Sequence, residues 1–185
     1  MANYKELEWL DERRRFRKVG RFKKFGVKKS SGDLLTKIKY TKISPFVDGI
    51  AVVEYQRFFF KQTILGIVTT DGKEVLFDKN CKKVVVLNKN VIAVKIEVEE
   101  ETYEWAIFNS EGIEPYGFRY EVCPTEFVNG FSQVKHKGKY NFINEMGKQL
   151  GVASYTRVAN FRKNGKAYVW VGNTRYVLRK DGVRE

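Results

Sequence analysis

The sequence predicts an all-β protein made of tandem antiparallel β-hairpin (meander) repeats, four complete and one partial, with a short N-terminal helix. Three observations predict this fold. Hydrophobic residues make up 43% of the 185 residues and aromatic residues 15%, and the bulky ones are mainly Phe, Tyr, Val and Ile, which suit the pleated surface of a sheet. Five octapeptides that end in glycine recur along the chain, and a second glycine-containing motif keeps a constant distance from them.

The octapeptides start 40, 40, 35 and 35 residues apart. Each begins with a run of strand-forming residues and closes on a glycine, where a tight hairpin turn needs a positive φ angle. We therefore expect every copy to contain a strand, a turn at the glycine and a second strand. The octapeptides are FGVKKSSG (25–32), LGIVTTDG (65–72), WAIFNSEG (105–112), YNFINEMG (140–147) and RYVLRKDG (175–182).

The second motif begins 14 or 15 residues after each of the first four of these glycines. It has an aromatic residue or Leu, then a turn, then an alternating strand, and we expect left-handed backbone at Gly49, Asn90, Gly130 and Gly165. Linkers that contain Tyr40, Tyr120 or Tyr155 join the two motifs. The copies of the second motif are FVDGIAVV (46–53), LNKNVIAV (87–94), FVNGFSQV (127–134) and FRKNGKAYV (161–169).

The repeat resembles the WG (KWG) repeat family. The likeness covers about residues 25–182 and is carried by the glycine turns, as in FGVKKSSG at 25–32, by YTKISPFVDGIAVV at 40–53 and by the period; the Trp-Gly pair itself reads Phe25-Gly26 in the first copy. The resemblance implies small β-sheet units packed in series, a binding or scaffolding role and no shared catalytic residues. We expect two regions, a capping helix with a basic segment at 1–24 and a single compact WG-like β-repeat domain at 25–185.

Residues 3–15 are predicted to form the N-terminal helix. Asn3 is a suitable N-cap, and Tyr4, Leu7 and Leu10 fall on one side of the helix. Since a helix of this length is marginal alone, we expect it to dock on the first sheet as a cap. The fifth octapeptide is followed by no second motif, so the array either stays open, which we favour, or closes against residues 16–28.

The predicted core takes its residues from both motifs. Those expected to be buried are Phe25, Phe46, Val53, Ile67, Val94, Trp105, Ile107, Phe127, Val134, Phe142, Ile143, Phe161, Val169 and Val177.

A basic segment at residues 13–29 is the main candidate site in a chain of net charge +13. It holds ten Lys or Arg and no Asp or Glu, and Phe16, Phe22 and Phe25 alternate with the cations, as in proteins that contact phosphates and stack on bases. Alternatively, the phenylalanines belong to the core and the cations form a solvated face, or an acidic protein binds there. The candidate residues for binding an anionic partner are Arg13, Arg14, Arg15, Arg17, Lys18, Arg21, Lys23, Lys24, Lys28 and Lys29.

No catalytic, metal-binding or cofactor-binding set of residues is predicted. His136 is the single histidine, and Cys81 and Cys123 lack the spacing of a zinc site or a disulfide framework. The acidic run at 97–104 is expected to be a solvated strand and turn, or to meet the basic segment of a neighbouring copy.

These observations predict a non-enzymatic structural or interaction protein, a component of a larger assembly such as a phage or virus particle. Its expected partner is another protein or neighbouring subunits; nucleic acid bound by residues 13–29 is the alternative. We expect a cytoplasmic protein, or a virion component assembled in the cytoplasm. No small-molecule substrate is evident from the sequence. No membrane association is expected, because no apolar stretch approaches the roughly 18 residues of a membrane-spanning helix.

Overall fold

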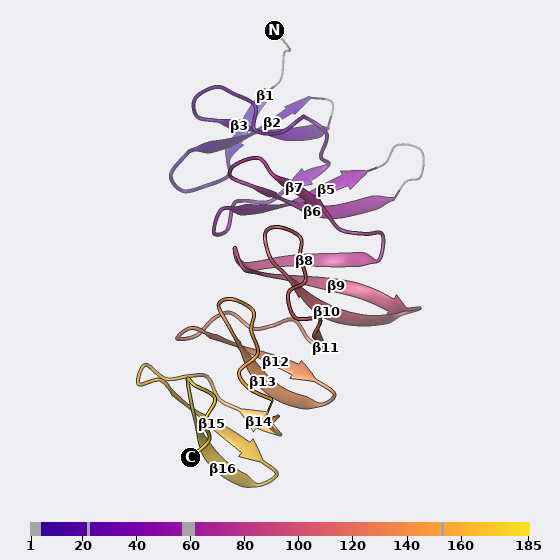
Figure 1. The fold of residues 1–185 in the computed structure, drawn as a ribbon. Helices are drawn as coiled ribbons and strands as arrows, with labels where there is room; N and C mark the ends of the chain where they lie inside the picture. The colour runs from indigo at the N-terminus through magenta and orange to yellow at the C-terminus, as the bar shows by residue number, and fades with distance from the viewer. Residues whose placement is uncertain (1–4, 22, 57–61, 153) are drawn as a thin grey trace.

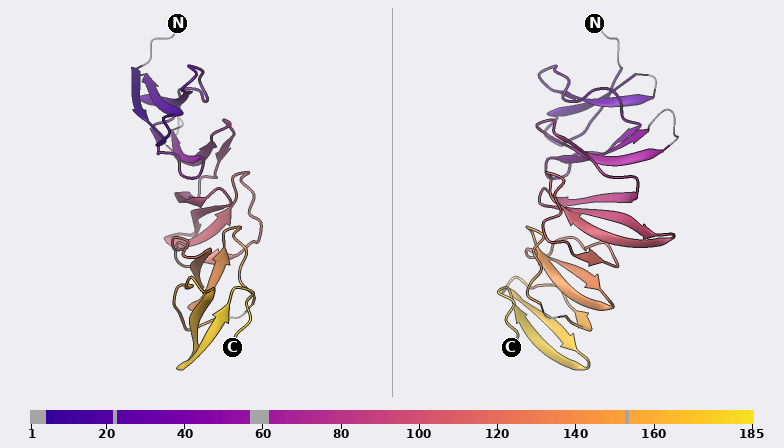
Figure 2. Two further views of the ribbon diagram at one scale, coloured as in Figure 1. Left: turned by 90° about the vertical axis from the view of Figure 1, so that its left-hand side faces the viewer. Right: turned by 45° about the vertical axis from the view of Figure 1, so that its right-hand side comes forward.

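A computed structural model describes residues 5–21, 23–56, 62–152 and 154–185, and every regular element in them is a β-strand. The strands form five antiparallel sheets that follow one another in a line, with β1 and β16 at opposite ends of the stack (Figure 1). The first and last sheets are not paired with each other, so the array is open, as the two turned views also show (Figure 2).

Each sheet contains one central hairpin whose second strand is an octapeptide strand of the predicted repeat. The sheet orders are β1-β2-β3, β4-β5-β6-β7, β11-β10-β9-β8, β12-β13 and β14-β15-β16. The strands are β1 (Lys5–Trp9), β2 (Phe16–Arg21), β3 (Lys24–Lys29), β4 (Lys42–Ile43), β5 (Ile50–Gln56), β6 (Thr63–Thr69), β7 (Glu74–Leu76), β8 (Cys81–Asn88), β9 (Val91–Glu99), β10 (Thr102–Phe108), β11 (Arg119–Tyr120), β12 (Phe131–His136), β13 (Lys139–Asn144), β14 (Arg157–Val158), β15 (Lys166–Val171) and β16 (Thr174–Arg179).

The five glycine turns are confirmed, and all five are built in the same way. In each, the glycine N–H donates to the carbonyl three residues earlier, and the N–H of that earlier residue donates to the carbonyl just after the glycine. This pattern is a type I turn followed by a bulge residue in left-handed conformation. The φ angles lie between 77° and 105° at Gly32, Gly72, Gly112, Gly147 and Gly182.

The turns of the second motif follow the prediction at three of four positions. Gly49, Gly130 and Gly165 have positive φ angles. Asn90 does not, so the prediction of left-handed backbone at this residue is wrong. The Asn90 N–H donates instead to Oδ1 of Asn88 at 2.8 Å. This side-chain hydrogen bond closes the turn between β8 and β9 without left-handed backbone.

The predicted N-terminal helix is wrong over the described residues. Residues 5–9 form β1, which pairs antiparallel with β2, and the proposed cap Asn3 lies outside the described residues. Strand pairing gives this segment main-chain partners and places its carboxylates against the cations of β2, whereas a short isolated helix has neither advantage. The boundary predicted between residues 24 and 25 falls inside the β2–β3 hairpin.

Three tyrosines hold equivalent places in the array. Tyr40, Tyr120 and Tyr155 each lie 15 residues after the start of an octapeptide and pair with its first residue. Their side chains are 0–1% exposed. In the second unit, Phe77 takes this place, since its N–H donates to the carbonyl of Leu65 at 2.9 Å.

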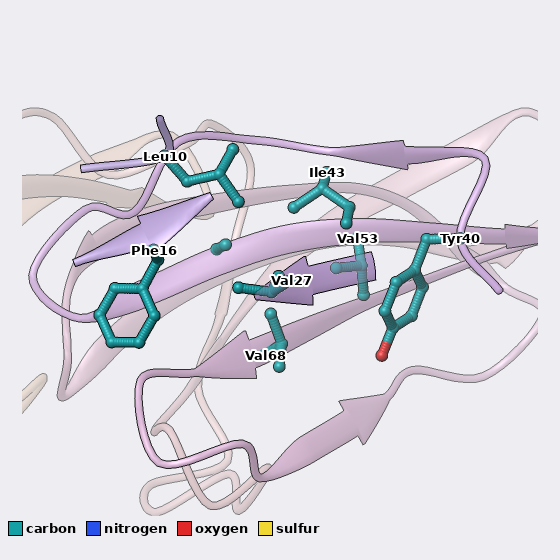
Figure 3. Packing of buried hydrophobic residues seen from close by; sticks show 8 residues of the cluster. Leu10, Phe16, Val27, Tyr40, Ile43, Val53 and Val68 are labelled. Atoms are coloured by element: carbon teal, nitrogen blue, oxygen red, sulfur yellow. The ribbon is translucent and has the colours of Figure 1, made fainter. Parts of the chain in front are cut away.

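The hydrophobic core is divided into four layers, each between two consecutive hairpins. Because side chains alternate along a strand, an inner hairpin supplies one face to each of two layers. In β5, for example, Ala51 and Val53 point into the first layer and Ile50 into the second. Figure 3 shows the first layer, in which Val27 and Val68 meet from neighbouring sheets.

Most of the predicted core residues are buried in these layers. Phe25, Phe46 and Phe127 are half-buried against them. Val177 is a correction, because it faces away from the last layer and Leu178 is the buried residue there. The buried members of the predicted set are Val53, Ile67, Val94, Trp105, Ile107, Val134, Phe142, Ile143, Phe161 and Val169.

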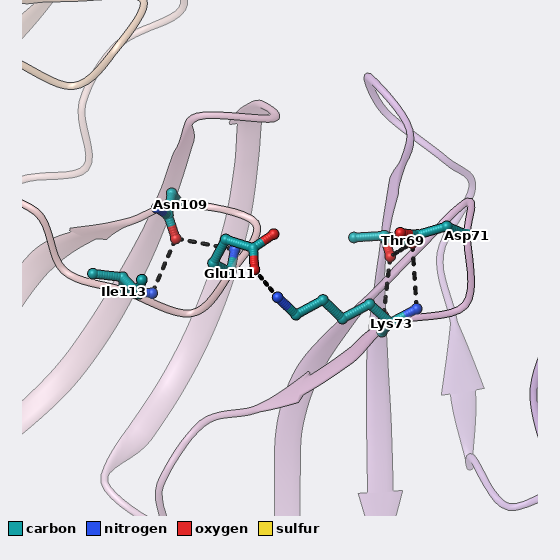
Figure 4. A network of polar contacts seen from close by, with 6 residues as sticks. All are labelled: Thr69, Asp71, Lys73, Asn109, Glu111 and Ile113. Carbon is teal, nitrogen blue, oxygen red and sulfur yellow. Dashed lines mark hydrogen bonds and ion pairs between the residues drawn. The ribbon is translucent and has the colours of Figure 1, made fainter.

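Polar contacts also join neighbouring units along the side of the stack that carries the glycine turns. Lys73, just after the second glycine turn, forms an ion pair with Glu111 of the third (Figure 4). The third turn is itself held by Oδ1 of Asn109, which accepts hydrogen bonds from the N–H groups of Glu111 and Ile113 at 3.0 Å each. The units are therefore tied together outside their apolar layers as well.

Candidate interaction surfaces

The basic segment lies at the N-terminal end of the stack, in β2, β3 and the turn before β2. The acidic residues of the first strand and the following turn lie beside it. Glu6 forms ion pairs with Arg17 and with Lys28, the latter at 2.5 Å. Two further ion pairs among the described residues join candidate cations to carboxylates of the same chain, Lys18–Glu8 and Arg15–Asp11.

These contacts stabilise the ionised form of two carboxylates. Hydrogen bonds from Lys28 and then from Arg17 hold the pKa of Glu6 below its usual value. Burial opposes the ionisation of Asp11, but hydrogen bonds from the Arg15 side chain and from backbone N–H groups outweigh it and lower the Asp11 pKa. The acidic first strand and turn thus act as an internal counter-charge for the basic segment.

The remaining candidate cations do not gather on one face. Arg13 and Arg14 are exposed in the turn before β2, and Lys23 is exposed in the turn between β2 and β3. Arg21 and Lys29 are exposed and Lys24 is half-buried. The structure therefore places these residues at the two opposite ends of the first hairpin.

The phenylalanines of the segment belong to the first core layer where they are described. Phe16 is buried and its ring centroid lies 4.9 Å from that of Phe46. Phe25 is half-buried under the ammonium group of Lys18, which lies 4.5 Å from its ring centroid. Phe22 lies outside the described residues. Neither described ring offers an open face for base stacking, as the alternative from the sequence anticipated.

The acidic run at 97–104 forms the end of the β9–β10 hairpin. Glu97 forms an ion pair with Lys82 at 2.5 Å, and the hydrogen bond from Lys82 is the main cause of a lowered Glu97 pKa. Glu99, Glu100 and Glu101 are exposed at the tip. Within the described ranges, no group of three or more His, Cys, Asp or Glu side chains is placed to hold a metal ion.

The histidine and the cysteines occupy structural positions. His136 ends β12, and its Nδ1–H donates to the carbonyl of Arg119 at 2.6 Å. Both cysteines are free thiols; burial raises the pKa of Cys81 to about 12 and also raises that of Cys123. Neither therefore provides the thiolate that nucleophilic catalysis needs at neutral pH.

A second surface, which the sequence analysis did not find, lies on the outer face of the last sheet. Tyr168 and Trp170 of β15 point away from the fourth core layer, and arginine side chains cover their rings. The signal in the sequence is the alternation of Lys166, Tyr168 and Trp170 with small or branched residues. The sequence alone does not mark this surface, because the charge in the region is spread over 29 residues (157–185) and forms no dense run.

Comparison with known families supports the predicted resemblance. A family model described as WG containing repeat matches residues 25–56, which run from the octapeptide strand β3 through Tyr40 to the end of β5. The match covers the first copy of the predicted repeat. No curated protein matches it. Among solved structures, one titled "AfRom2 CNH domain" is similar with a TM-score of 0.29 and 8% identity, over 97% of this chain and 82% of that chain.

The structure explains why the second residue of the WG pair is a glycine. A Cβ atom at Gly26 would lie 3.0 Å from the carbonyl oxygen of Lys37, and one at Gly66 would lie 2.5 Å from that of Val75. The backbone after each glycine turn therefore crosses close over the second octapeptide residue in these two repeats, and a side chain would push it away. Ala106 and Asn141 hold this place in the third and fourth copies, where both are buried.

Proposed function

We propose that this WG-repeat protein is a non-enzymatic interaction module that works as one component of a larger assembly. The open stack supports this proposal most directly. Its apolar layers lie between the hairpins, which leaves two long sides and two end faces for partners. An extended surface of this kind suits binding and scaffolding.

The setting that we propose is the cytoplasm, or a particle such as a phage or virus particle that is assembled there. The free thiols of Cys81 and Cys123 are in keeping with a reducing compartment. The described residues contain no helix that could span a membrane.

Purification from the native source tests the proposal. We expect the tagged chain to elute in a stoichiometric complex of larger mass, which light scattering after size exclusion would measure. A matched variant with Arg13, Arg14 and Lys23 changed to Ser should retain the same partner, which would show that charge adsorption does not hold it. A free monomer in both preparations at physiological salt would contradict the proposal.

Nucleic-acid binding by residues 13–29 stays a prediction, and no contact in the structure favours it over binding of an acidic protein. A steep fall of affinity with salt, lost when the exposed cations of the segment become Ser, would support it.

A further inference from the structure

The last sheet presents an outer face that no further hairpin covers in the described part of the chain. On β15, Ala167 and Val169 point into the fourth core layer, so Tyr168 and Trp170 point outward. The residues paired with Trp170 are Arg157 of β14 and Arg175 of β16, which lie on the same face. The outer face of this antiparallel sheet therefore has two aromatic side chains at its centre, with ring planes inclined at 66° to each other.

Three guanidinium groups lie against these rings. The Arg157 carbon Cζ is 3.9 Å from the centroid of the Trp170 ring, and those of Arg162 and Arg175 are 4.3 and 4.6 Å from the Tyr168 ring. Attraction between a cation and an aromatic ring holds such groups in place. The two ring centroids are 6.4 Å apart.

None of these three arginines has a carboxylate within ion-pair distance among the described residues. Their N–H groups are therefore not committed to an internal anion. By contrast, Lys166 and Arg179 at the edge of the sheet are paired with Glu185. The centre of the face keeps its positive charge, while part of its edge is neutralised.

The surroundings of the face are also basic. Residues 157–185 contain eight Lys or Arg and two Asp or Glu. A hollow of about 380 Å³ opens between the turn that precedes β15 and the turn that follows β16, and four of its seven lining residues are cations. These cations are Lys163, Lys166, Arg179 and Lys180.

We propose that this face, formed by Arg157, Arg162, Tyr168, Trp170 and Arg175, binds single-stranded nucleic acid. Bases stack on aromatic rings and on guanidinium planes, and arginine N–H groups bind phosphate oxygens. The guanidinium groups that lie over Trp170 and Tyr168 provide both kinds of contact, since their planes can stack with bases and their N–H groups can bind phosphates. The binding depends little on sequence, because every base has a flat face to stack.

Single-stranded nucleic acid fits this face better than the other anionic or stacking partners. An acidic peptide would match the charge but would leave the paired aromatic side chains without a role. A second copy of this chain stacked end to end would present its first sheet, where the carboxylates of Glu6 and Glu8 are already paired with Arg17, Lys28 and Lys18, so the described strands of that sheet offer the three arginines no unpaired anion. A duplex keeps its bases stacked within the helix, so only its phosphates would be available.

Fluorescence anisotropy with labelled oligonucleotides tests the proposal. A ten-nucleotide single strand should bind, and a strand of the same length without bases should bind about tenfold more weakly or worse, because stacking is lost. Changing Trp170 to Ala should weaken binding by about tenfold, while Phe at this position should keep most of the affinity. Changing Arg157, Arg162 and Arg175 to Gln should remove most of the salt dependence.

The matched control removes the same charge elsewhere, with Arg13, Arg14 and Lys23 changed to Gln. It should keep the preference for the strand with bases. Thermal melting of each variant shows that the fold is retained. Tryptophan fluorescence supplies a second readout: once Trp9 is changed to Phe, the remaining Trp105 is 8% exposed, so quenching on binding reports on Trp170 and should vanish in a further Trp170→Phe variant.

Two results would overturn the proposal. Equal affinity for strands with and without bases would show that charge alone is recognised. Equal or tighter binding of polyglutamate, with loss in the arginine variant, would assign the face to an acidic protein. Both outcomes leave the proposed role in an assembly intact, because that role is judged from native mass and stoichiometry.

Discussion

The two ends of the stack carry similar amounts of positive charge but arrange it differently. At the N-terminal end, Arg17 and Lys28 converge on the carboxylate of Glu6, and the described aromatic rings of the basic segment pack into the first core layer. At the C-terminal end, Arg157, Arg162 and Arg175 converge on aromatic rings. The density of cations in a sequence therefore does not show which cations are open to a partner.

The difference comes from what pairs with each hairpin. The first hairpin is flanked by β1, which brings carboxylates next to the basic strand. The last hairpin is flanked by β14, a two-residue strand that brings another arginine. The short strand that flanks the terminal hairpin thus determines whether the cations at that end of the stack are paired with carboxylates.

The largest expected effects come from removing one aromatic ring from the core at each end. Phe161, 1% exposed, stacks on Phe131 with ring centroids 4.1 Å apart, and Phe16, 7% exposed, contacts Phe46 at 4.9 Å. Changing Phe161 to Ala should lower the free energy of unfolding by about 4 kcal/mol and changing Phe16 by about 3 kcal/mol, as measured by urea denaturation.

Hydrogen exchange shows whether the core layers act separately. In the Phe161 variant, amide exchange should accelerate in the last two sheets and stay slow in the first, because each layer contacts only its neighbours. Uniform acceleration along the whole chain would contradict the division into layers.

The second expected effect concerns Asp11 at the N-terminal end. Its carboxylate accepts hydrogen bonds from the N–H groups of Arg15 and Phe16 at 2.7 and 3.0 Å and from Nε of Arg15 at 2.8 Å. Changing Asp11 to Ala should lower the free energy of unfolding by about 2 kcal/mol at pH 7, again measured in urea.

The loss of stability in the Asp11→Ala variant should depend on pH, because only the ionised Asp11 carboxylate makes these hydrogen bonds at full strength. The folded-state pKa of Asp11 lies below the usual 3.8, so its contribution is complete above that value and is lost as the pH falls through the lowered pKa. The difference between the wild type and the Asp11→Ala variant should shrink between pH 5 and pH 2. A difference that does not change with pH would show that the charge of Asp11 contributes nothing.

A smaller effect is expected at the buried tyrosines. The hydroxyl of Tyr155 is buried without a hydrogen-bond partner, so changing Tyr155 to Phe should raise the free energy of unfolding by about 1 kcal/mol. The Tyr40 hydroxyl, in the first layer, is also buried without a hydrogen-bond partner among the described residues, but burial raises the Tyr40 pKa and the nearby carboxylate of Glu74 raises it further, which favours the protonated hydroxyl. Changing Tyr40 to Phe should therefore stabilise less. Thermal melting of the two variants compares the ends, and a larger gain at Tyr40 would contradict this explanation.

The smallest effect should appear when the N-terminal end is made more like the C-terminal end. Changing Glu6 to Gln removes the carboxylate shared by Arg17 and Lys28, and affinity for a strand without bases should rise by about threefold at low salt. The control is Glu99→Gln, at the exposed tip of the β9–β10 hairpin, which should change the affinity less. Equal increases in both variants would mean that only net charge matters.

The sequence predicted the repeat well because its turns are local. Gly32, Gly72 and their equivalents need left-handed backbone whatever lies around them, and the tyrosine linkers keep a fixed distance from them. The first strand could not be predicted in this way. Residues 5–9 suit a helix or a strand by pattern, and the choice depends on pairing with β2, which local propensity does not describe.

The sites were harder to predict than the fold. The basic run at 13–29 was evident, but its partners Glu6 and Glu8 are brought to it only by the β1–β2 pairing. Predicting the outer face of the last sheet would have required knowledge of which side of β15 points into the core. The prediction that Val177 is buried assigned the wrong side of β16 to the core, because Leu178 is the residue that points inward.

The separation of the core into layers along a single line has a mechanical consequence. The first and last sheets lie at opposite ends of the stack (Figure 1), so a force applied through β1 and β16 pulls along the direction in which the layers are arranged. Hairpins would be peeled away from the ends one unit at a time, instead of the whole stack shearing at once. Each step would release 35 or 40 residues, about 12 to 14 nm of extended chain, so the protein would lengthen under tension in regular increments.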